Sequence, residues 1–327
     1  MSEKILEVRQ LATSFHTERG WQQAIDGVSF DVYQGEILGI VGESGSGKSV
    51  TAYSVMQILA PTGKIVSGSV KFDGQELVGA DEKLLRSVRG NRISIIFQDP
   101  MTSLNPTYTI GRQLMEAILL HTDRNRHQAC ERAVEMLKLG NVNEPEKRMK
   151  QYPHQLSGGM RQRVMIAMAL ACEPDILLAD EPTTALDVTI QAQIMRLLKQ
   201  LQEKMGTSII LITHDLGIVA QIAKHVMVMY CGQAVEYSDV RSIYKNPLHP
   251  YTAGLLRSIP KLTDDDMEEL PSIPGMVPSP SEKLQGCRFA PRCEKCGARC
   301  KKEMPDLVTL EDGRKVRCFL YEGGVEG

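Results

Sequence analysis

Leu156-Ser157-Gly158-Gly159-Met160 stands directly before an arginine-containing apolar run that predicts a helix. Its two glycines allow the backbone to approach a phosphate closely, and the N–H groups at the start of the following helix point toward such an anion. The hydroxyl of Ser157 supplies a further donor. This stretch is therefore predicted to bind a phosphate group, and it decides how the other motifs are interpreted.

A phosphate loop lies upstream. Gly42-Glu-Ser-Gly-Ser-Gly-Lys-Ser49 fits the pattern G-x-x-x-x-G-K-[ST], between a short apolar run at 36–41 that predicts a buried strand and a predicted helix at 50–59. Its backbone N–H groups are expected to cradle the β-phosphate, Lys48 to reach the β- and γ-phosphates, and Ser49 to ligate Mg²⁺. The alternative, a Gly/Ser-rich turn before a helix, is disfavoured by the other motifs.

Two carboxylates follow the next predicted strand. Asp180 ends the apolar run 176–179, so its side chain should emerge at the carboxyl edge of an α/β sheet and hold Mg²⁺. Glu181 is the candidate general base for an attacking water. Alternatively the pair caps the next helix, a role that better suits Asp187.

These motifs together resemble those of ATP-binding cassette (ABC) ATPases, in which two subunits sandwich ATP. The resemblance implies an α/β fold: a RecA-like P-loop core, an antiparallel β subdomain and a helical subdomain. It assigns ATP contacts to Phe15, Gly42, Ser44, Gly45, Gly47, Lys48, Ser49, Val50, Ser157, Gly158, Gly159 and Asp187. It assigns Mg²⁺ to Ser49, Gln98 and Asp180, and catalysis to Glu181, His214 and Gln98.

Three of these assignments depend on the resemblance rather than on the residues. Gln98 matches the family's Q-loop, and His214 its switch histidine, although a lone histidine at a strand end is more often structural. Phe15 stands where the family places the aromatic that stacks on adenine. Trp21 is the alternative, and either ring could merely pack at the sheet edge.

Composition limits the remaining possibilities. The chain has 327 residues, of which 42% are hydrophobic and 24% charged, the balance of a globular protein. A net charge of −2 gives no electrostatic basis for binding nucleic acid. The sequence contains neither a signal-peptide pattern nor an apolar run of membrane-spanning length. We therefore expect a cytoplasmic protein that needs other chains to cross a membrane.

The sequence predicts three regions. Residues 1–260 form the nucleotide-binding domain, whose helical subdomain covers about 99–171, and 261–285 form a proline-rich connector before a small Cys-rich module at 286–327. Within the first region we expect strands at 5–8, 28–32 and 226–230, a turn at Gly20, and helices at 126–140 and 187–205.

Other stretches narrow the resemblance to one branch, the ATPase subunits of dipeptide, oligopeptide and nickel ABC importers. They are Phe97-Gln-Asp-Pro-Met-Thr-Ser-Leu-Asn-Pro106, Asn246-Pro-Leu-His-Pro-Tyr-Thr-Ala-Gly-Leu-Leu256, Ser272-Ile-Pro-Gly275 and Gly286-Cys-Arg-Phe-Ala-Pro-Arg-Cys293. Val50, after the phosphate-loop serine, resembles the first of the branch's two sister ATPases.

The branch implies a peripheral subunit at the cytoplasmic face of the membrane. Its partners would be a sister ATPase, two transmembrane permeases and an extracytoplasmic peptide-binding protein. Nickel import is the alternative cargo. A soluble ABC ATPase acting on nucleic acid or ribosomes is the alternative class, against which speaks the lack of a second cassette or a coiled-coil insertion. An ABC exporter is disfavoured by the importer-like tail.

The tail cysteines leave two kinds of metal site open, a zinc site and an iron–sulfur cluster, with free thiols as the third alternative. Structural disulfides are not expected in a cytoplasmic protein. Cys293 and Cys296 form a C-x-x-C pair that could be half of a zinc site. The resemblance instead implies a [4Fe–4S] cluster on Cys287, Cys293, Cys300 and Cys318, and Cys296 departs from that pattern.

Overall fold

The chain divides into two units in the computed structural model, and each is described on its own. One unit comprises Met1–Ile5, Val32–Ile37 and Gly79–Ile212, and the other comprises Leu6–Asp31, Leu38–Val78 and Thr213–Gly327. The structure describes residues 3–184, 186–259, 272–278 and 285–322. We call the two units the signature unit and the phosphate-loop unit, after the motif that each contains.

Three parallel strands form the sheet of the signature unit. They pair in the order β6 (Ile93–Ile96), β7 (Ile176–Asp180) and β8 (Ser208–Thr213), with Ile93 opposite Ile176 and Ile176 opposite Ser208. Every residue of β7 and β8 is buried. Runs that are apolar on both faces are typical of parallel strands covered on each side, and they direct the polar residues to the strand ends.

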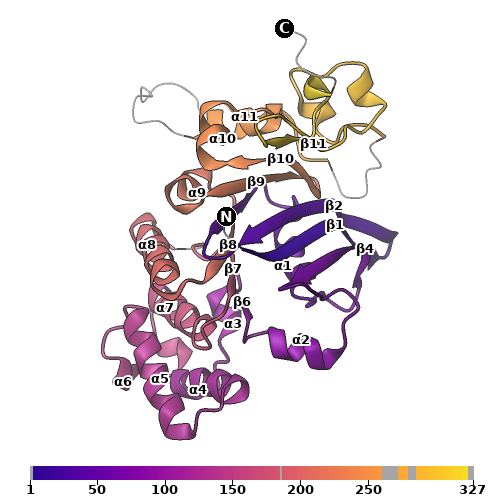
Figure 1. Cartoon of the computed structure of the whole chain (residues 1–327). Coiled ribbons are helices and arrows are strands. Elements are labelled where there is room, and N and C mark those ends of the chain that lie inside the picture. The colour runs from indigo at the N-terminus through magenta and orange to yellow at the C-terminus, as the bar shows by residue number, and fades with distance from the viewer. Residues whose placement is uncertain (1–2, 185, 260–271, 279–284, 323–327) are drawn as a thin grey trace. The chain divides into compact units, whose positions relative to one another are not determined.

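Helices make up most of the same unit. They are α2 (Glu82–Val88), α3 (Pro100–Ser103), α4 (Ile110–His121), α5 (Arg126–Leu139), α6 (Pro145–Arg148), the short 3₁₀ turn η1 (Pro153–Gln155), α7 (Gly158–Ala169) and α8 (Val188–Met205). In Figure 1 the magenta helices α4 and α5 lie together beside α7. Helices α3 to α7 lie in the stretch 99–171.

The two helices predicted from periodicity are confirmed nearly to the residue. α5 begins after a capping box between Asn125 and Gln128 and ends at Gly140, and its predicted apolar face is fully buried. α8 begins one residue after the predicted start because Asp187 is its N-cap, and it ends at Gly206, whose φ of 72° suits a glycine C-cap.

The phosphate-loop unit contains a four-stranded antiparallel sheet in the order β2-β1-β4-β5. Its strands are β1 (Lys4–Thr17), β2 (Gly20–Tyr33), β4 (Gly63–Phe72) and β5 (Gln75–Glu76), shown in indigo and violet in Figure 1. The predicted strands at 5–8 and 28–32 were too short. An irregularity in the pairing between Arg9 and Ala12, where Gln10 has a φ of 47°, interrupts the alternation on which that prediction depended.

The second sheet of this unit is mixed. β3 (Ile37–Val41) pairs in parallel with β9 (His225–Tyr230), which confirms the predicted strand at 226–230; β10 (Gln233–Asp239), β12 (Lys315–Val316) and β11 (Val308–Thr309) continue it antiparallel. Val316 lies opposite Glu236. The chain's C-terminal part is thus joined to a strand that precedes it by about eighty residues, as Figure 1 shows beside β10.

The helices of the phosphate-loop unit are short. They are α1 (Lys48–Val55), α9 (Leu216–Ile222), α10 (Val240–Lys245) and α11 (Pro250–Arg257), with 3₁₀ turns η2 (Ala290–Arg292), η3 (Arg299–Lys301) and η4 (Phe319–Tyr321). α1 starts and ends earlier than the predicted 50–59, and Gln57 after it has a φ of 54°. Most of the predicted connector, 261–271 and 279–284, lies outside the described residues.

Candidate functional site

The phosphate loop joins β3 to α1 in the phosphate-loop unit. Its glycines are required by shape: Gly42 has a φ of 157°, and a Cβ there would lie 2.2 Å from the carbonyl oxygen of Met229. At Gly47, with a φ of 97°, a Cβ would lie 2.7 Å from Ile25 Cγ2. Gly45 also has a positive φ, and with Ser44 it is exposed at the loop's tip. Only glycine gives this backbone its close approach to neighbouring segments.

Lys48 is buried and folds back over the loop. Its Nζ donates to the carbonyl oxygen of Gly42 at 2.8 Å and to that of Glu43 at 3.1 Å. Ser49 and Val50 follow in the first turn of α1, both half-buried. The ammonium group is thus held at the loop by backbone dipoles that a phosphate could replace.

Phe15 and Trp21 belong to neighbouring strands and have different environments. Phe15 is half-buried and packs on Gly63, where a Cβ would lie 2.6 Å from the ring. Trp21 is 53% exposed, with its ring edge-to-face against His16 and the Lys64 ammonium 4.1 Å from its centroid. Both aromatic candidates are therefore in the phosphate-loop unit, and Trp21 has the more open face.

His214 lies one residue past the end of β8. It is exposed, whereas Asp215 after it caps α9 by accepting from the Ile218 N–H at 3.1 Å. Thr213 accepts from the Asp215 N–H at 3.0 Å and fixes the turn. His214 is therefore at the surface, and its predicted role stays a prediction.

Asp180 and Glu181 differ in burial although they are adjacent. Asp180, the last residue of β7, is fully buried. Glu181 has a φ of 44°, which is uncommon for a residue other than glycine and often marks functional turns. Its N–H donates to Ile212 O at 2.9 Å, so the turn is anchored to β8. The buried carboxylate of Asp180 is thus followed directly by a residue, Glu181, whose backbone is strained.

Gln98 and Glu181 are brought together by the structure. Gln98 Nε2 donates to Glu181 Oε2 at 2.9 Å, and the hydroxyl of Thr184 donates to the same oxygen at 2.9 Å. The Thr184 contact has no counterpart among the sequence predictions, although its position three residues after Glu181 is the signal that could have indicated it. One oxygen of the predicted general base therefore has two polar contacts.

The Leu156–Met160 stretch forms a helix start as predicted. Gly158 and Gly159 are the first residues of α7, and Ser157 is its N-cap, accepting from the Met160 N–H at 3.4 Å. The Ser157 oxygen thus acts as an acceptor within the cap in addition to its predicted use as a donor. Asp187 caps α8 by accepting from the Ile190 N–H at 2.9 Å, and Ala185 before it lies outside the described residues.

Glu43, Tyr251 and Arg292 form a connection that sequence reasoning missed. Arg292 makes a forked ion pair with the Glu43 carboxylate, with distances of 2.7 and 3.1 Å, and the Glu43 N–H donates to the Tyr251 hydroxyl at 2.9 Å. Tyr251 and Arg292 lie in stretches that served only to recognise a branch. The separation of 249 residues between Glu43 and Arg292 leaves no local pattern that could indicate the contact.

The tail cysteines lie near one another as thiols. The Cys287 N–H donates to Cys300 O at 2.8 Å, and the Cys296 N–H donates to Cys293 O at 3.2 Å. Burial raises the pKa of the Cys287 and Cys293 thiols and raises that of Cys318 to about 11, and repulsion between the neighbouring sulfurs adds to each rise.

The cysteines fit a soft metal by donor chemistry but not by arrangement. Thiolate sulfur is the ligand of zinc and of iron–sulfur clusters, and a bound cation would offset the repulsion between the sulfurs. Among the described residues, however, no group of three or more His, Cys, Asp or Glu side chains is positioned to hold a metal ion. The predicted Cys-rich metal module is therefore not confirmed.

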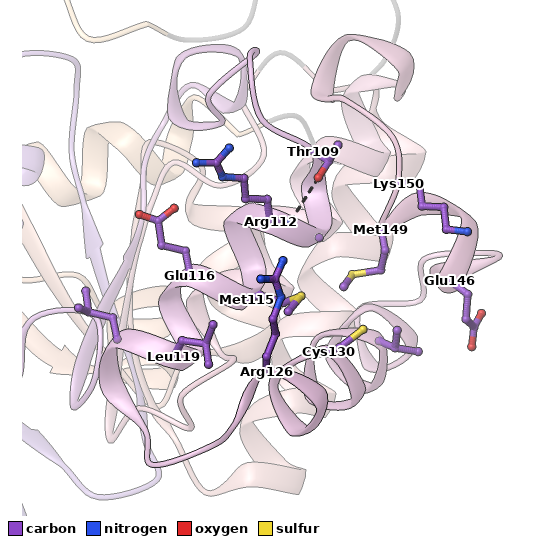
Figure 2. A pocket seen from close by; sticks show the side chains of 13 residues that line it. Thr109, Arg112, Met115, Glu116, Leu119, Arg126, Cys130, Glu146, Met149 and Lys150 are labelled. Carbon is purple, nitrogen blue, oxygen red and sulfur yellow. Dashed lines mark hydrogen bonds between the residues drawn. The ribbon is translucent and has the colours of Figure 1, made fainter.

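An open pocket of about 990 Å³ lies among the helices of the signature unit. Figure 2 shows Arg112, Met115, Glu116 and Leu119 of α4 on one side, and Arg126 and Cys130 of α5 on another. Leu120 in its lining is 75% exposed. The lining of the pocket combines apolar and charged groups. All of its residues come after Gln98 in the sequence. No helix among the described residues is both long and apolar enough to cross a membrane.

Comparison with known families places two matches along the chain. A family model described as ABC transporter matches residues 25–184, and one described as Oligopeptide/dipeptide transporter, C-terminal region, matches residues 235–300. The first spans the phosphate loop, Gln98, Ser157 and Glu181. The second spans Tyr251, Arg292 and four of the five tail cysteines.

Relatives of similar length are about half identical. "Oligopeptide transport ATP-binding protein AppD" of Bacillus subtilis (strain 168) is 51% identical over 319 residues, covering 97% of each chain. "Dipeptide transport ATP-binding protein DppD" of Escherichia coli (strain K12) is 48% identical over 314 residues, covering 96% of each chain.

Solved structures support the fold independently. The ATP-binding cassette MJ0796, in a dimeric post-hydrolysis state with ADP and Pi, is 28% identical with a TM-score of 0.65, covering 72% of this chain and 99% of its own. CbiO1 from Clostridium perfringens, part of an ABC transporter complex, is 28% identical with a TM-score of 0.63, covering 75% and 92%. The ABC ATPase fold expected from the motifs is confirmed.

Proposed function

Because this chain belongs to the oligopeptide and dipeptide branch of ABC transporter ATP-binding proteins, we propose that it hydrolyses ATP to power peptide uptake. It is an ABC-type ATPase whose hydrolysis is coupled to transport. The assignment of peptides as the cargo depends on the similarity to peptide transport proteins, which extends over nearly the whole chain and includes the C-terminal region. Neither nickel import nor action on nucleic acid is favoured by these relatives.

The nucleotide chemistry follows from the groups described above. ATP would lie on the phosphate loop, with its β-phosphate on the backbone from Gly42 to Val50 and Lys48 turned from its carbonyl partners toward the phosphates. Mg²⁺ would offset phosphate charge, held by Ser49, Asp180 and Gln98. Adenine would stack on Phe15, with Trp21 the alternative.

Glu181 would take the proton of the attacking water. The motivating geometry is its carboxylate, one oxygen of which accepts hydrogen bonds from Gln98 and Thr184, so that the group has a fixed orientation. His214, exposed at the end of β8, would contact the γ-phosphate. The boundaries proposed for this machinery are 1–260 for the nucleotide-binding domain, 261–285 for the connector and 286–327 for the Cys-rich part.

A second ATPase subunit would complete each site. We propose that Ser157, Gly158, Gly159 and Asp187 contact ATP held by a sister chain, for which this chain is the first of the two sisters. The start of α7 offers backbone N–H groups at that surface. The dimeric cassette among the solved neighbours is a precedent for such pairing.

Two transmembrane permeases would bind this subunit at the cytoplasmic face of the membrane, and its ATP hydrolysis would drive them. The surface around Gln98 and the segment after it, with exposed Phe97 and the pocket of Figure 2, is the proposed contact for them. An extracytoplasmic peptide-binding protein would select the cargo. Apolar groups that a monomer leaves exposed beside charged ones are typical of a partner surface.

Transport itself tests the proposal. Membrane vesicles that contain this chain, its sister ATPase and the two permeases, supplied with the peptide-binding protein, should take up a labelled dipeptide or tetrapeptide with ATP, and uptake should fail with Glu181→Gln in this chain. Exchange of an exposed carboxylate on α8, Glu203→Gln, is the matched control and should preserve uptake. Uptake of labelled nickel but of neither peptide would contradict the peptide assignment.

Association tests the two-subunit site. The isolated chain should be a weak ATPase and mostly monomeric, and a hydrolysis-blocked variant should dimerise with ATP in sedimentation experiments. The reason is that Lys48 and Ser157 belong to different units and are proposed to act across an interface. Full ATPase activity from a strictly monomeric preparation would exclude this arrangement.

A [4Fe–4S] cluster on Cys287, Cys293, Cys300 and Cys318 is proposed for the tail, with zinc as the alternative. The support is the backbone hydrogen bond between Cys287 and Cys300, together with the nearby sulfurs that help to raise the pKa of Cys287, Cys293 and Cys318 after burial, the largest cause. A cluster would stabilise a segment that has little core of its own.

Anaerobic purification tests the cluster. Brown protein with about four irons per chain is expected, and single Ser replacements at the four cysteines should bleach it. Cys296→Ser is the matched control and should keep the colour. Colourless protein with one zinc per chain would overturn the cluster.

A further inference from the structure

Arg292, in the loop between Cys287 and Cys293, reaches the phosphate loop within the same unit. Its side chain is 4% exposed, and its guanidinium meets both oxygens of Glu43 in a fork of 2.7 and 3.1 Å. Forked pairs between arginine and a carboxylate fix direction as well as distance. Arg292 is thus a buried, charged support for the second residue of the phosphate loop.

The remaining donors of Arg292 are also used. Nε donates to Pro274 O at 3.1 Å, one terminal nitrogen donates to Ile273 O at 3.3 Å, and the other to the Tyr230 hydroxyl at 3.4 Å. A guanidinium whose donors are all directed in this way has little freedom to turn. The segment at 272–275 therefore orients Arg292 toward Glu43.

Glu43 is held from its backbone as well as its side chain. Its N–H donates to the Tyr251 hydroxyl at 2.9 Å, and its carbonyl oxygen accepts from Lys48 Nζ and from the Ser46 N–H at 3.2 Å. The Tyr251 ring packs against Phe289, from the same loop as Arg292, at 5.4 Å between centroids. The peptide plane that begins the phosphate cradle is thus fixed by residues of the C-terminal region.

A second arginine of this loop supports the neighbouring backbone. Arg288 donates to the carboxylate of Asp26 and to the carbonyl oxygen of Cys231. The next residue, Gly232, accepts from the Asp26 N–H at 2.8 Å and donates to Ser46 O at 2.9 Å. The segment between Cys287 and Cys293 therefore supports the phosphate loop at two positions, Glu43 directly and Ser46 through Gly232.

We propose that Arg292 is a positioning residue for nucleotide binding, which holds the phosphate loop ready for ATP through Glu43. Without Arg292, the Glu43 carboxylate is uncompensated beside the place where phosphates bind, and it repels them. The loop backbone also loses its buried support and must be ordered by the nucleotide at a cost in affinity. The proposal rests on the proposed function only in that ATP binds the phosphate loop.

Titration of the full-length protein with a fluorescent ATP analogue and Mg²⁺ tests this role. Arg292→Met should weaken affinity about tenfold, the range expected for lost charged hydrogen bonds, and Arg292→Lys should weaken it less because the charge remains. The double variant E43Q/R292M should be no weaker than R292M, because the two groups act as one pair. Arg299→Gln, which removes a charge that pairs with Glu303 and Glu322 in the same tail, is the matched control.

Amide hydrogen exchange without nucleotide gives a second readout. Exchange at 42–49 should rise in R292M and stay at the wild-type level in R299Q. Affinity and exchange in R292M equal to those of R299Q, or additive losses in the double variant, would overturn the role of Arg292. Wild-type protein that binds no ATP would instead overturn the proposed function. If R292M does not fold, R292K and Glu43→Gln carry the same comparison.

Discussion

The phosphate loop and the carboxylate turn after β7 handle the same nucleotide in the proposed function, yet they are held in opposite ways. Glu43 in the loop is gripped by buried Arg292 and by the Tyr251 hydroxyl. Glu181 in the turn is held by Thr184 and by an amide from exposed Gln98. Buried partners cannot exchange without disturbing a core, whereas an exposed amide can change partners easily. In the proposed function, binding would thus depend on fixed contacts, and hydrolysis on contacts that can be rearranged.

The largest effect should come from the turn. Glu181→Gln removes the group that accepts a proton but keeps an oxygen for the contact with Gln98, so ATP affinity should persist while turnover falls about 10²–10⁴-fold. Steady-state ATPase assays and nucleotide titration measure the two separately. Turnover within a few-fold of wild type would show that Glu181 is not the base and would break the comparison.

Lys48→Ala should give the opposite pattern. The buried ammonium is the positive group of the phosphate loop. Its removal should abolish tight ATP binding rather than slow the hydrolysis of bound ATP. A titration with ATP in the absence of hydrolysis reports this directly. Retention of near-normal affinity in Lys48→Ala would mean that the loop binds phosphate through its backbone alone.

Gln98→Ala sharpens the difference at the turn. Loss of one hydrogen bond to a carboxylate should lower kcat by about tenfold, with little change in ATP affinity. Thr184→Val removes the other contact to the same oxygen and is the matched variant. If both variants change ATP affinity rather than kcat, the turn supports ATP binding, as the phosphate loop does, and not hydrolysis.

The smallest effect concerns pH and the support of the phosphate loop. His249, whose Nδ1 accepts from the Tyr251 N–H at 3.0 Å, is buried, and burial lowers its pKa to about 3, with Arg317 adding to the fall. Because this folded-state pKa lies below the usual 6.5, the stabilisation is complete above pH 6.5 and is lost as pH falls toward 3.

Thermal unfolding between pH 7 and pH 4 tests the sign. The melting temperature should fall with acid by about 2–4 °C more in wild type than in His249→Asn, which can keep the helix cap but cannot be protonated. Equal slopes for the two proteins would remove His249 from the set of buried supports.

Motifs whose residues are close together in the sequence were predictable. Contacts between residues that are far apart in the sequence were not. The phosphate loop, the strand-end position of Asp180 and the start of α7 depend on local backbone chemistry that a few adjacent residues specify. The forked pair of Glu43 and Arg292 depends on tertiary folding alone. Strand lengths failed at the irregularity near Gln10, because an irregular pairing hides the alternation that defines a strand.

The cysteines show a different limit. Their spacing and type predicted a metal site, but the sulfurs that the structure brings near one another are not arranged as ligands. Without the ion, burial and mutual repulsion favour neutral thiols, as the raised pKa values of Cys287, Cys293 and Cys318 indicate. The sequence shows which residues could serve as metal donors, whereas their arrangement in space is not specified by spacing alone.

The separation of 249 residues between Glu43 and Arg292 has a consequence for chain synthesis. At about 5–20 residues per second, the phosphate loop leaves the ribosome roughly 10–50 s before its arginine support is made. An incomplete chain therefore carries the loop without the grip on Glu43. If Arg292 positions the phosphate loop as proposed, an incomplete chain should bind ATP about tenfold more weakly than a finished subunit, and should compete poorly with it for nucleotide.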